Sequence, residues 1–131
     1  MCKVFINADP ELWSPQSRSL RLHGAATSVR LETLYWRVLE EIGERDGMNV
    51  NQLITTLHDE LLEARGEVSN FASFLRVCCA RYLMLQVAGR IPADLGVPIR
   101  SLDPDYVLAG EHFPARGSSA SSGQLFESRQ G

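Results

Sequence analysis

The chain has 131 residues, of which 44% are hydrophobic and 22% are charged. This apolar fraction supports a hydrophobic core and excludes a fully disordered chain, and the length suits one compact domain with tails. The sequence has no run of 18 apolar residues and no apolar segment typical of a signal peptide, so we expect a cytoplasmic protein. The net charge of -3, taken as a single number, argues mildly against a nucleic-acid ligand.

The charges are distributed unevenly along the chain. Residues 14–31 carry three arginines and no acidic residue, whereas residues 32–67 carry nine acidic residues and three arginines. Residues 68–90 again carry three arginines and no acidic residue. The overall acidity therefore leaves room for a basic surface formed by residues 14–31.

Cysteine and histidine form no pattern typical of catalysis or metal binding. The three cysteines are an odd count, which argues against a disulfide framework. The three histidines are far apart in sequence, and zinc, nucleophile and phosphate-loop motifs are absent. We therefore expect no enzymatic activity and no cofactor. The residues concerned are Cys2, Cys78, Cys79, His23, His58 and His112.

The first half of the chain predicts an irregular arm followed by strand-like segments. Residues 1–17 contain two prolines and are expected to be irregular. The apolar residues then lie at even positions in 19–22 and at odd positions in 27–31. Because one face of a strand keeps one parity, the chain must bend or bulge at 23–26. Two alternatives stay open: the segments form a hairpin, or they are successive strands that pair with another chain.

Three helices are predicted next. The first starts at Glu32 or Thr33 and ends at Gly47, which can adopt a positive φ. The second is capped by Asn49 and closed by Gly66, with its apolar residues spaced three and four apart. The third starts at Ser69 or Asn70 and runs to about residue 88.

The third helix and the tail differ in character. The helix is apolar on several sides, which indicates that it is buried or pairs with another subunit. Residues 91–131 are rich in proline and serine, and we predict an extended tail to about residue 116 that is disordered after it.

A single short strand poses a physical problem, because its unpaired backbone groups cannot form a sheet alone. An identical strand from a second chain would complete a two-stranded ribbon, with Val29 and Leu31 inward and Ser28 and Arg30 outward. Such a ribbon fits the major groove of DNA.

Residues 27–62, TSVRLETLYWRVLEEIGERDGMNVNQLITTLHDELL, resemble the ribbon-helix-helix family of DNA-binding proteins. The resemblance covers about 18–65 and is closest to a bacterial group with a Thr-Ser-Val-Arg-Leu-Glu strand and a tryptophan in the first helix. It implies a mostly α fold with an intermolecular antiparallel β-ribbon, two helices and an added third helix, in an obligate dimer. The expected domains are an arm (1–17), the ribbon-helix-helix domain (18–66), a third helix for dimer or oligomer packing (67–90) and the tail (91–131).

The resemblance also assigns candidate DNA contacts. Base readout would come from the outward strand positions, which are Ala26, Ser28 and Arg30, although many members have a polar or basic residue in place of Ala26. Phosphates would be held by the start of the second helix and by neighbouring ribbon residues. This second set is Thr27, Asn49, Val50 and Asn51, together with Arg18 and Arg21, which precede the strand and are not explained by the minimal family motif.

The function that follows is a homodimeric, sequence-specific transcriptional regulator, most simply a repressor that occludes a promoter. Its partners would be double-stranded DNA and a second copy of itself. One alternative is an antitoxin that wraps a toxin with residues 91–116. Another is a non-DNA interaction module in which the third helix drives oligomerisation. A small ligand of the third helix or tail stays conceivable, but no residue identifies one.

Overall fold

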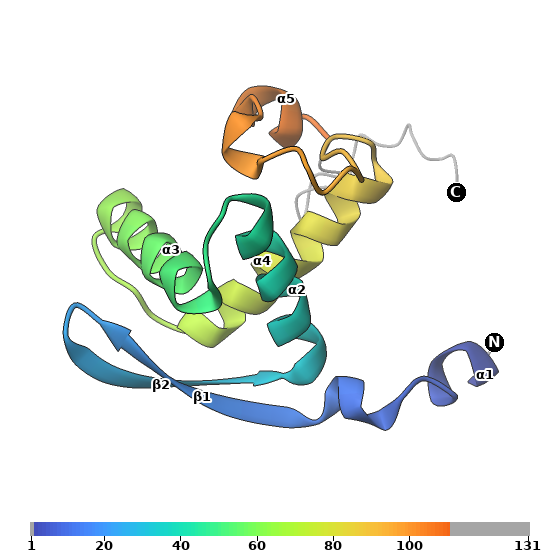
Figure 1. Ribbon diagram of the computed structural model, residues 1–131, viewed down its shortest axis with the longest axis horizontal. Coiled ribbons are helices and arrows are strands. Elements are labelled where there is room, and N and C mark those ends of the chain that lie inside the picture. The colour runs from blue at the N-terminus through green and yellow to red at the C-terminus, as the bar shows by residue number, and fades with distance from the viewer. Residues whose placement is uncertain (1, 111–131) are drawn as a thin grey trace, which may run out of the picture.

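A computed structural model describes residues 2–110 of the chain. A β-hairpin lies along one side, α2, α3 and α4 pack above it, and α5 lies on the far side of these helices (Figure 1). The N-terminal residues lead away from one end of the hairpin (Figure 1). In chain order the elements are α1 (Cys2–Ile6), the 3-10 helix η1 (Pro10–Trp13), β1 (Pro15–Leu22), β2 (Ala25–Glu32), α2 (Thr33–Arg45), α3 (Val50–Arg65), α4 (Phe71–Val87), the 3-10 helix η2 (Ile99–Ser101) and α5 (Pro104–Leu108).

The ribbon is formed within one chain. β1 and β2 pair antiparallel from Pro15 opposite Glu32 to Leu22 opposite Ala25. Of the two pairings that the sequence left open, the structure has the hairpin, and the expectation of an intermolecular ribbon is corrected. The two strands satisfy each other's backbone groups, so a second chain is not needed to complete the ribbon.

The hairpin turn explains the change of parity between the strands. Two residues, His23 and Gly24, connect the strands with φ angles of 54° and 84°. Positive φ at both central positions is typical of the type I′ turn, whose twist matches that of paired strands. Crossing this turn places even positions of β1 and odd positions of β2 on the same face, where Leu20, Leu22, Val29 and Leu31 are buried.

The ribbon-helix-helix order with an added third helix is confirmed, and the predicted helix ends lie within two residues of the observed ones. Asn49 caps α3 by accepting a hydrogen bond from the Gln52 amide, and Gly66 closes the helix with a φ of 81°. α2 begins after Glu32 as predicted. Local capping chemistry thus defines both ends of α3, whereas Glu32 makes no side-chain capping hydrogen bond at the start of α2.

The core lies between the inner face of the ribbon and the three long helices. Its largest fully buried side chains come from the ribbon and each of these helices, and Trp36 at its centre donates its indole N–H to the Gln16 carbonyl oxygen at 2.9 Å. These side chains are Leu31, Trp36, Leu39, Ile54, Leu75 and Cys79.

Both ends of the described chain are more ordered than the sequence predicted. Within the expected irregular arm, the chain forms α1 and η1, and β1 begins at Pro15. In the expected extended tail, residues 91–110 contain η2 and α5, and the side chain of Ile91 is buried in the core. The expectation for 111–131 lies outside the described residues. No helix among residues 2–110 is long and apolar enough to cross a membrane.

Candidate nucleic-acid interface

The outer face of the ribbon is polar and exposed. Six side chains point away from the core, and in the register of the hairpin they form three cross-strand pairs. The pairs are Ser17 with Arg30, Ser19 with Ser28, and Arg21 with Ala26. The face therefore carries one arginine near each end and two serines at its centre, with no acidic side chain among the six.

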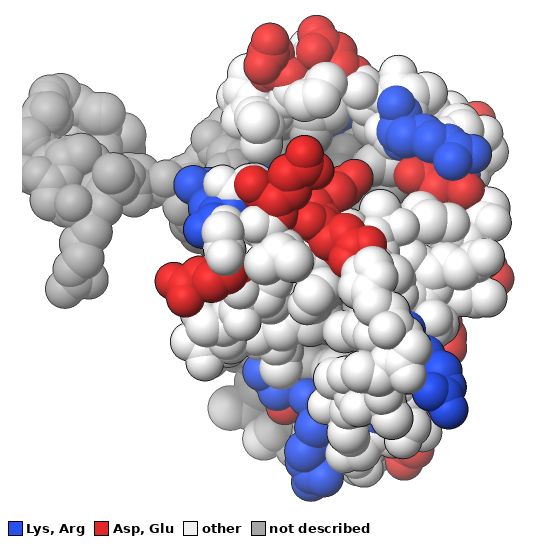
Figure 2. All heavy atoms as spheres, turned by 90° about the vertical axis from the view of Figure 1, so that its left-hand side faces the viewer, with Lys and Arg blue, Asp and Glu red and all other residues white. Residues whose placement is uncertain are grey.

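Acidic side chains are concentrated in the helical part of the molecule, whereas the outer face of the ribbon carries only basic charges. Figure 2 shows acidic side chains gathered across the helical part of one face, and basic ones at its lower edge, where the ribbon lies, as well as at the upper right and the left. An anionic ligand would thus be attracted to the ribbon and repelled by the helices above it. The net charge of -3 conceals this separation.

Arg21 connects the ribbon to the start of α3. Its side-chain Nη1 donates to the Gly24 carbonyl oxygen at 2.9 Å, and its backbone amide donates to Asn51 Oδ1 at 3.2 Å. The turn end of the outer face and the first turn of α3 are therefore held next to each other. Arg21 and Asn51 both belong to the residues that the sequence analysis assigned to phosphate contact.

Two of the predicted phosphate contacts, Arg18 and Thr27, lie on the side of the ribbon that faces the helices. Arg18 lies on the inner side of β1, where its guanidinium stands 4.5 Å from the centre of the Trp36 ring and Nη2 lies 3.2 Å from Glu40 Oε2. Thr27 is partly buried on the inner side of β2. The structure therefore separates Arg18 and Thr27 from the outer face that carries Ser28 and Arg30.

The N-terminus of α3 keeps backbone amides for an anion. In its capping box, Asn49 Oδ1 accepts from the Gln52 amide at 2.8 Å and Gln52 Oε1 accepts from the Asn49 amide at 2.9 Å. The first-turn amides of Val50 and Asn51 are not used by this box and have no intrahelical acceptor. They lie where the helix dipole favours a negative charge.

A close backbone approach fixes the turn that presents these amides. Gly43 of α2 accepts a hydrogen bond from the Met48 amide at 2.9 Å. A Cβ atom on Gly43 would stand 2.7 Å from the Met48 carbonyl oxygen, which is closer than packing allows. The sequence offered no signal for this role, because Gly43 sits inside an ordinary helical pattern.

α4 supports the junction between ribbon and α2. Arg76 Nε donates to Glu32 Oε1 at 2.9 Å, and this hydrogen bond lowers the pKa of Glu32. On the same helix, burial raises the pKa of Cys79 to about 12, so its thiol stays protonated at neutral pH. The two adjacent cysteines thus have the environment of small apolar residues rather than of reactive thiolates.

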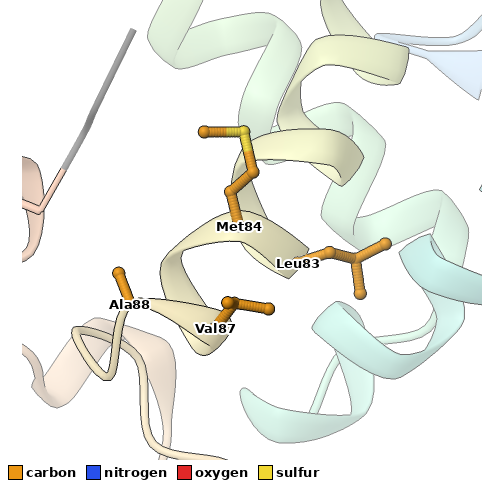
Figure 3. Close-up of a pocket in the computed structure, with 4 residues that line it drawn as sticks. All are labelled: Leu83, Met84, Val87 and Ala88. Atoms are coloured by element: carbon orange, nitrogen blue, oxygen red, sulfur yellow. The ribbon is translucent and has the colours of Figure 1, made fainter. Parts of the chain in front are cut away.

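The far end of α4 exposes an apolar hollow. Leu83, Met84, Val87 and Ala88 line it, and the close-up shows these side chains without a charged group among them (Figure 3). Val87 is 91% exposed. The sequence predicted that this helix is apolar on several sides. One apolar side of α4 packs in the core, and the described residues leave another apolar side exposed.

Sequence reasoning missed two of the six residues of the outer face. Ser17 and Ser19 belong to it, and they were overlooked because β1 was expected to begin later and its pairing was open. The alternation of Leu20 and Leu22 carried the needed signal, since the odd residues before them must point outward once the hairpin is accepted.

Comparison with known proteins gives the same framework. A family model described as ribbon-helix-helix domain matches residues 15–83. The structure is similar to that of an uncharacterized protein from Bordetella pertussis Tohama I, with 61% sequence identity and a TM-score of 0.82. That match covers 88% of this chain and 95% of the other. No curated protein matches the chain.

Proposed function

Because this chain belongs to the ribbon-helix-helix domain family, we propose that it is a sequence-specific DNA-binding transcriptional regulator. The observation that supports this most directly is the outer face of the ribbon, where exposed Arg30 and Ser28 point away from the core beside Ser17 and Ser19. A two-stranded ribbon has the dimensions to enter the major groove.

The side chains of the outer face suit direct reading of base edges. Arg30 can donate two hydrogen bonds to O6 and N7 of guanine, and the serines can bond to several base edges. Ala26 offers a methyl group to the methyl of thymine. The face thus combines one strongly selective contact with several permissive ones.

Phosphate contacts would orient the ribbon in the groove. The amides of Val50 and Asn51 bind an anion in this proposal, and Arg21 of the outer face is joined to Asn51 through its backbone amide. These contacts hold the protein on the backbone without reading sequence. Arg18 contributes less than the sequence suggested, because its guanidinium is already engaged by Trp36 and Glu40.

The regulator acts as a homodimer in this proposal. Members of the family typically bind DNA as dimers. A second copy would cover the apolar side of α4 at Leu83 and Val87, which are exposed in the single chain. Bound across a promoter in the bacterial cytoplasm, one or more dimers would repress transcription by excluding polymerase.

The antitoxin alternative loses part of its basis. It needs the tail free to wrap a toxin, yet residues 94–99 are bound to the chain's own α2 end. Arg45 donates to the carbonyl oxygens of Asp94 and Val97, and the Ile99 amide donates to Asp46 Oδ1. Residues 91–110 could wrap a partner only after their hydrogen bonds to Arg45 and Asp46 have broken.

The experiment begins with selection of bound fragments from random and genomic DNA by the full chain. Affinity for the selected site is then measured for the wild type, Arg30→Ala and the matched control Arg100→Ala. Arg100 is also exposed but lies in η2, on the side of the helices away from the ribbon (Figure 1). Loss of a bidentate base contact is worth about 1–3 kcal/mol, which is roughly a 5- to 150-fold loss of affinity.

Arg30→Ala should also relax base preference at one position, whereas Arg100→Ala should change affinity by less than about twofold. Affinity should fall steeply with salt, with a slope that reports the number of phosphates contacted. If no sequence is enriched, or if the two variants bind alike, the ribbon is not the reading surface.

The dimer is tested by light scattering on the purified chain. Val87→Asp places a charge in the apolar hollow and should shift the protein toward monomer. Val4→Asp is the control, since Val4 is also exposed and apolar but lies in α1. Equal masses for wild type and Val87→Asp would exclude α4 as the dimer surface.

A further inference from the structure

Three metal-ligating side chains meet where the hairpin turn reaches α3. His23 lies in the turn, and His58 and Asp59 lie in α3. His23 Nε2 is 2.6 Å from Asp59 Oδ1, and His58 Nδ1 is 3.4 Å from the same oxygen. One ligand atom from each residue lies within 4.8 Å of those of the other two. The fold thus brings together groups that are 35 residues apart in sequence.

The two histidines are placed by different parts of the structure. His58 is only 21% exposed, and its ring contacts the Phe71 ring edge-on with centroids 5.4 Å apart. His23 occupies the first central position of the type I′ turn at a φ of 54°, where asparagine, aspartate or glycine is usual. The turn geometry therefore does not call for histidine, but it does direct the imidazole toward α3.

The ligand set is chemically selective. Two imidazole nitrogens and one carboxylate oxygen suit zinc and similar transition ions, whereas Mg²⁺ and Ca²⁺ prefer oxygen ligands. Bonds of 2.0–2.2 Å around a tetrahedral ion put ligand atoms about 3.3 Å apart. The distance of 3.4 Å between His58 and Asp59 is close to this value, and the 2.6 Å between His23 and Asp59 must lengthen when an ion enters between them, for which the 64% exposed side chain of His23 leaves room.

We propose that His23, His58 and Asp59 bind a divalent transition-metal ion of the zinc type, with water as the fourth ligand, and that this ion fastens the ribbon turn to α3. Three protein ligands and one open position form a recognised zinc arrangement. Two of the ligands come from one helix and the third from the hairpin, so the ion crosslinks two elements of the fold.

The location of the site connects it to DNA binding, a step that depends on the function proposed above. Arg21 and Asn51 join the same end of the ribbon to the first turn of α3 through the hydrogen bond of 3.2 Å. A metal ion fixes the angle between the reading face and the phosphate-binding amides. An ion that binds the DNA-competent arrangement more tightly raises the affinity for DNA by the same factor.

Metal binding is measured first, without DNA, on the untagged full chain freed of metal by a chelator. Titration with ZnCl₂ in a calorimeter should give one ion per chain, and CoCl₂ should produce the visible absorption of a site with nitrogen and oxygen ligands. Zinc at a hundredfold excess over its dissociation constant should raise Tm by roughly 5–15 °C.

The decisive variants are His23→Asn and Asp59→Asn. Asparagine is well tolerated at positive φ, so His23→Asn keeps the hairpin while it removes the ligand. Each variant should weaken zinc binding at least tenfold and abolish the rise in Tm, with the metal-free Tm within a few degrees of wild type. Cys2→Ser and His112→Gln are controls that remove other zinc-binding groups, and both should bind zinc like wild type.

The outcomes separate the metal site from the proposed function. The site is refuted if wild type and His23→Asn bind zinc equally, or if a control variant removes the binding. DNA affinity is then measured with and without zinc, and wild type should gain affinity that His23→Asn does not. Zinc binding with no effect on DNA affinity would overturn the coupling. Zinc binding by a chain that selects no DNA would overturn the regulator instead.

Discussion

Arg45 is a buried cation that should contribute unusually strongly to stability. It is 5% exposed and lies at the end of α2. Nε donates to the Val97 carbonyl oxygen at 3.0 Å, Nη2 donates to that of Asp94 at 3.0 Å, and Nη1 donates to the Tyr82 hydroxyl at 3.2 Å. The guanidinium thus joins α2, α4 and the segment after α4.

The perturbation is Arg45→Met, which keeps an unbranched stem and removes the guanidinium. Hydrogen bonds from a charged donor contribute about 1.5–3 kcal/mol each. The exposed carbonyl of Asp94 can exchange its partner for water, so two bonds remain to be counted in full. We expect the free energy of unfolding to fall by about 3–5 kcal/mol, within the range for breaking a buried charged interaction.

Urea unfolding followed by tryptophan fluorescence measures this loss, because Trp36 is fully buried in the folded chain. Arg37→Met is the matched control, since Arg37 is an exposed arginine of the same helix, and it should change stability by less than about 0.5 kcal/mol. Residues 94–97 should also become more sensitive to protease in Arg45→Met. A loss below 1 kcal/mol would refute the reasoning that this cation holds the segment after α4.

Three further predictions concern the junctions of the fold, and each is checked by the free energy of unfolding. Gly43→Ala should destabilise the chain by about 1–3 kcal/mol, because the new Cβ would stand 2.7 Å from the Met48 carbonyl oxygen. This loss should exceed the gain from the better helix propensity of alanine. A gain in stability would disprove the close approach. Asn49→Ala should cost about 1 kcal/mol by removing the capping box of α3, and an unchanged stability would mean that the cap contributes nothing. Glu32→Gln should cost about 0.2–1 kcal/mol at neutral pH, since the ion pair with Arg76 is partly exposed. Because that pair lowers the pKa of Glu32, its contribution is present above the unfolded pKa and is lost as pH falls through the folded one, so the two proteins should converge in stability below about pH 4. A difference that persists in acid would contradict the ion-pair explanation.

The sequence by itself determined the three long helices and their order after the ribbon strands. The caps at Asn49 and Gly66 and the apolar spacing of α3 are local features, which depend on neighbours within four residues. The same holds for the outward positions Ser28 and Arg30, because alternation along a strand is also local. These features sufficed to predict the ribbon-helix-helix order and the outward-facing residues of β2.

Only the tertiary structure decided how the ribbon is paired. The backbone ladder is the same whether its two strands come from one chain or from two, so the alternation in 19–31 is compatible with both. The turn at His23 and Gly24 and the resulting register were needed to place Ser17 and Ser19 on the outer face and Arg18 against Trp36. Local pattern assigned Arg18, Arg21 and Arg30 alike to DNA contact.

The contacts with the largest separation in sequence were beyond prediction for the same reason. Arg45 meets Val97, and His23 meets Asp59, across 52 and 36 residues. Helical periodicity assigns a residue to a face of its own helix, but it does not say which distant loop packs on that face. The sequence therefore determined the elements and their surfaces. The packing of these elements decided which charges are buried, which side chains could share a metal ion and which face of the ribbon stays exposed.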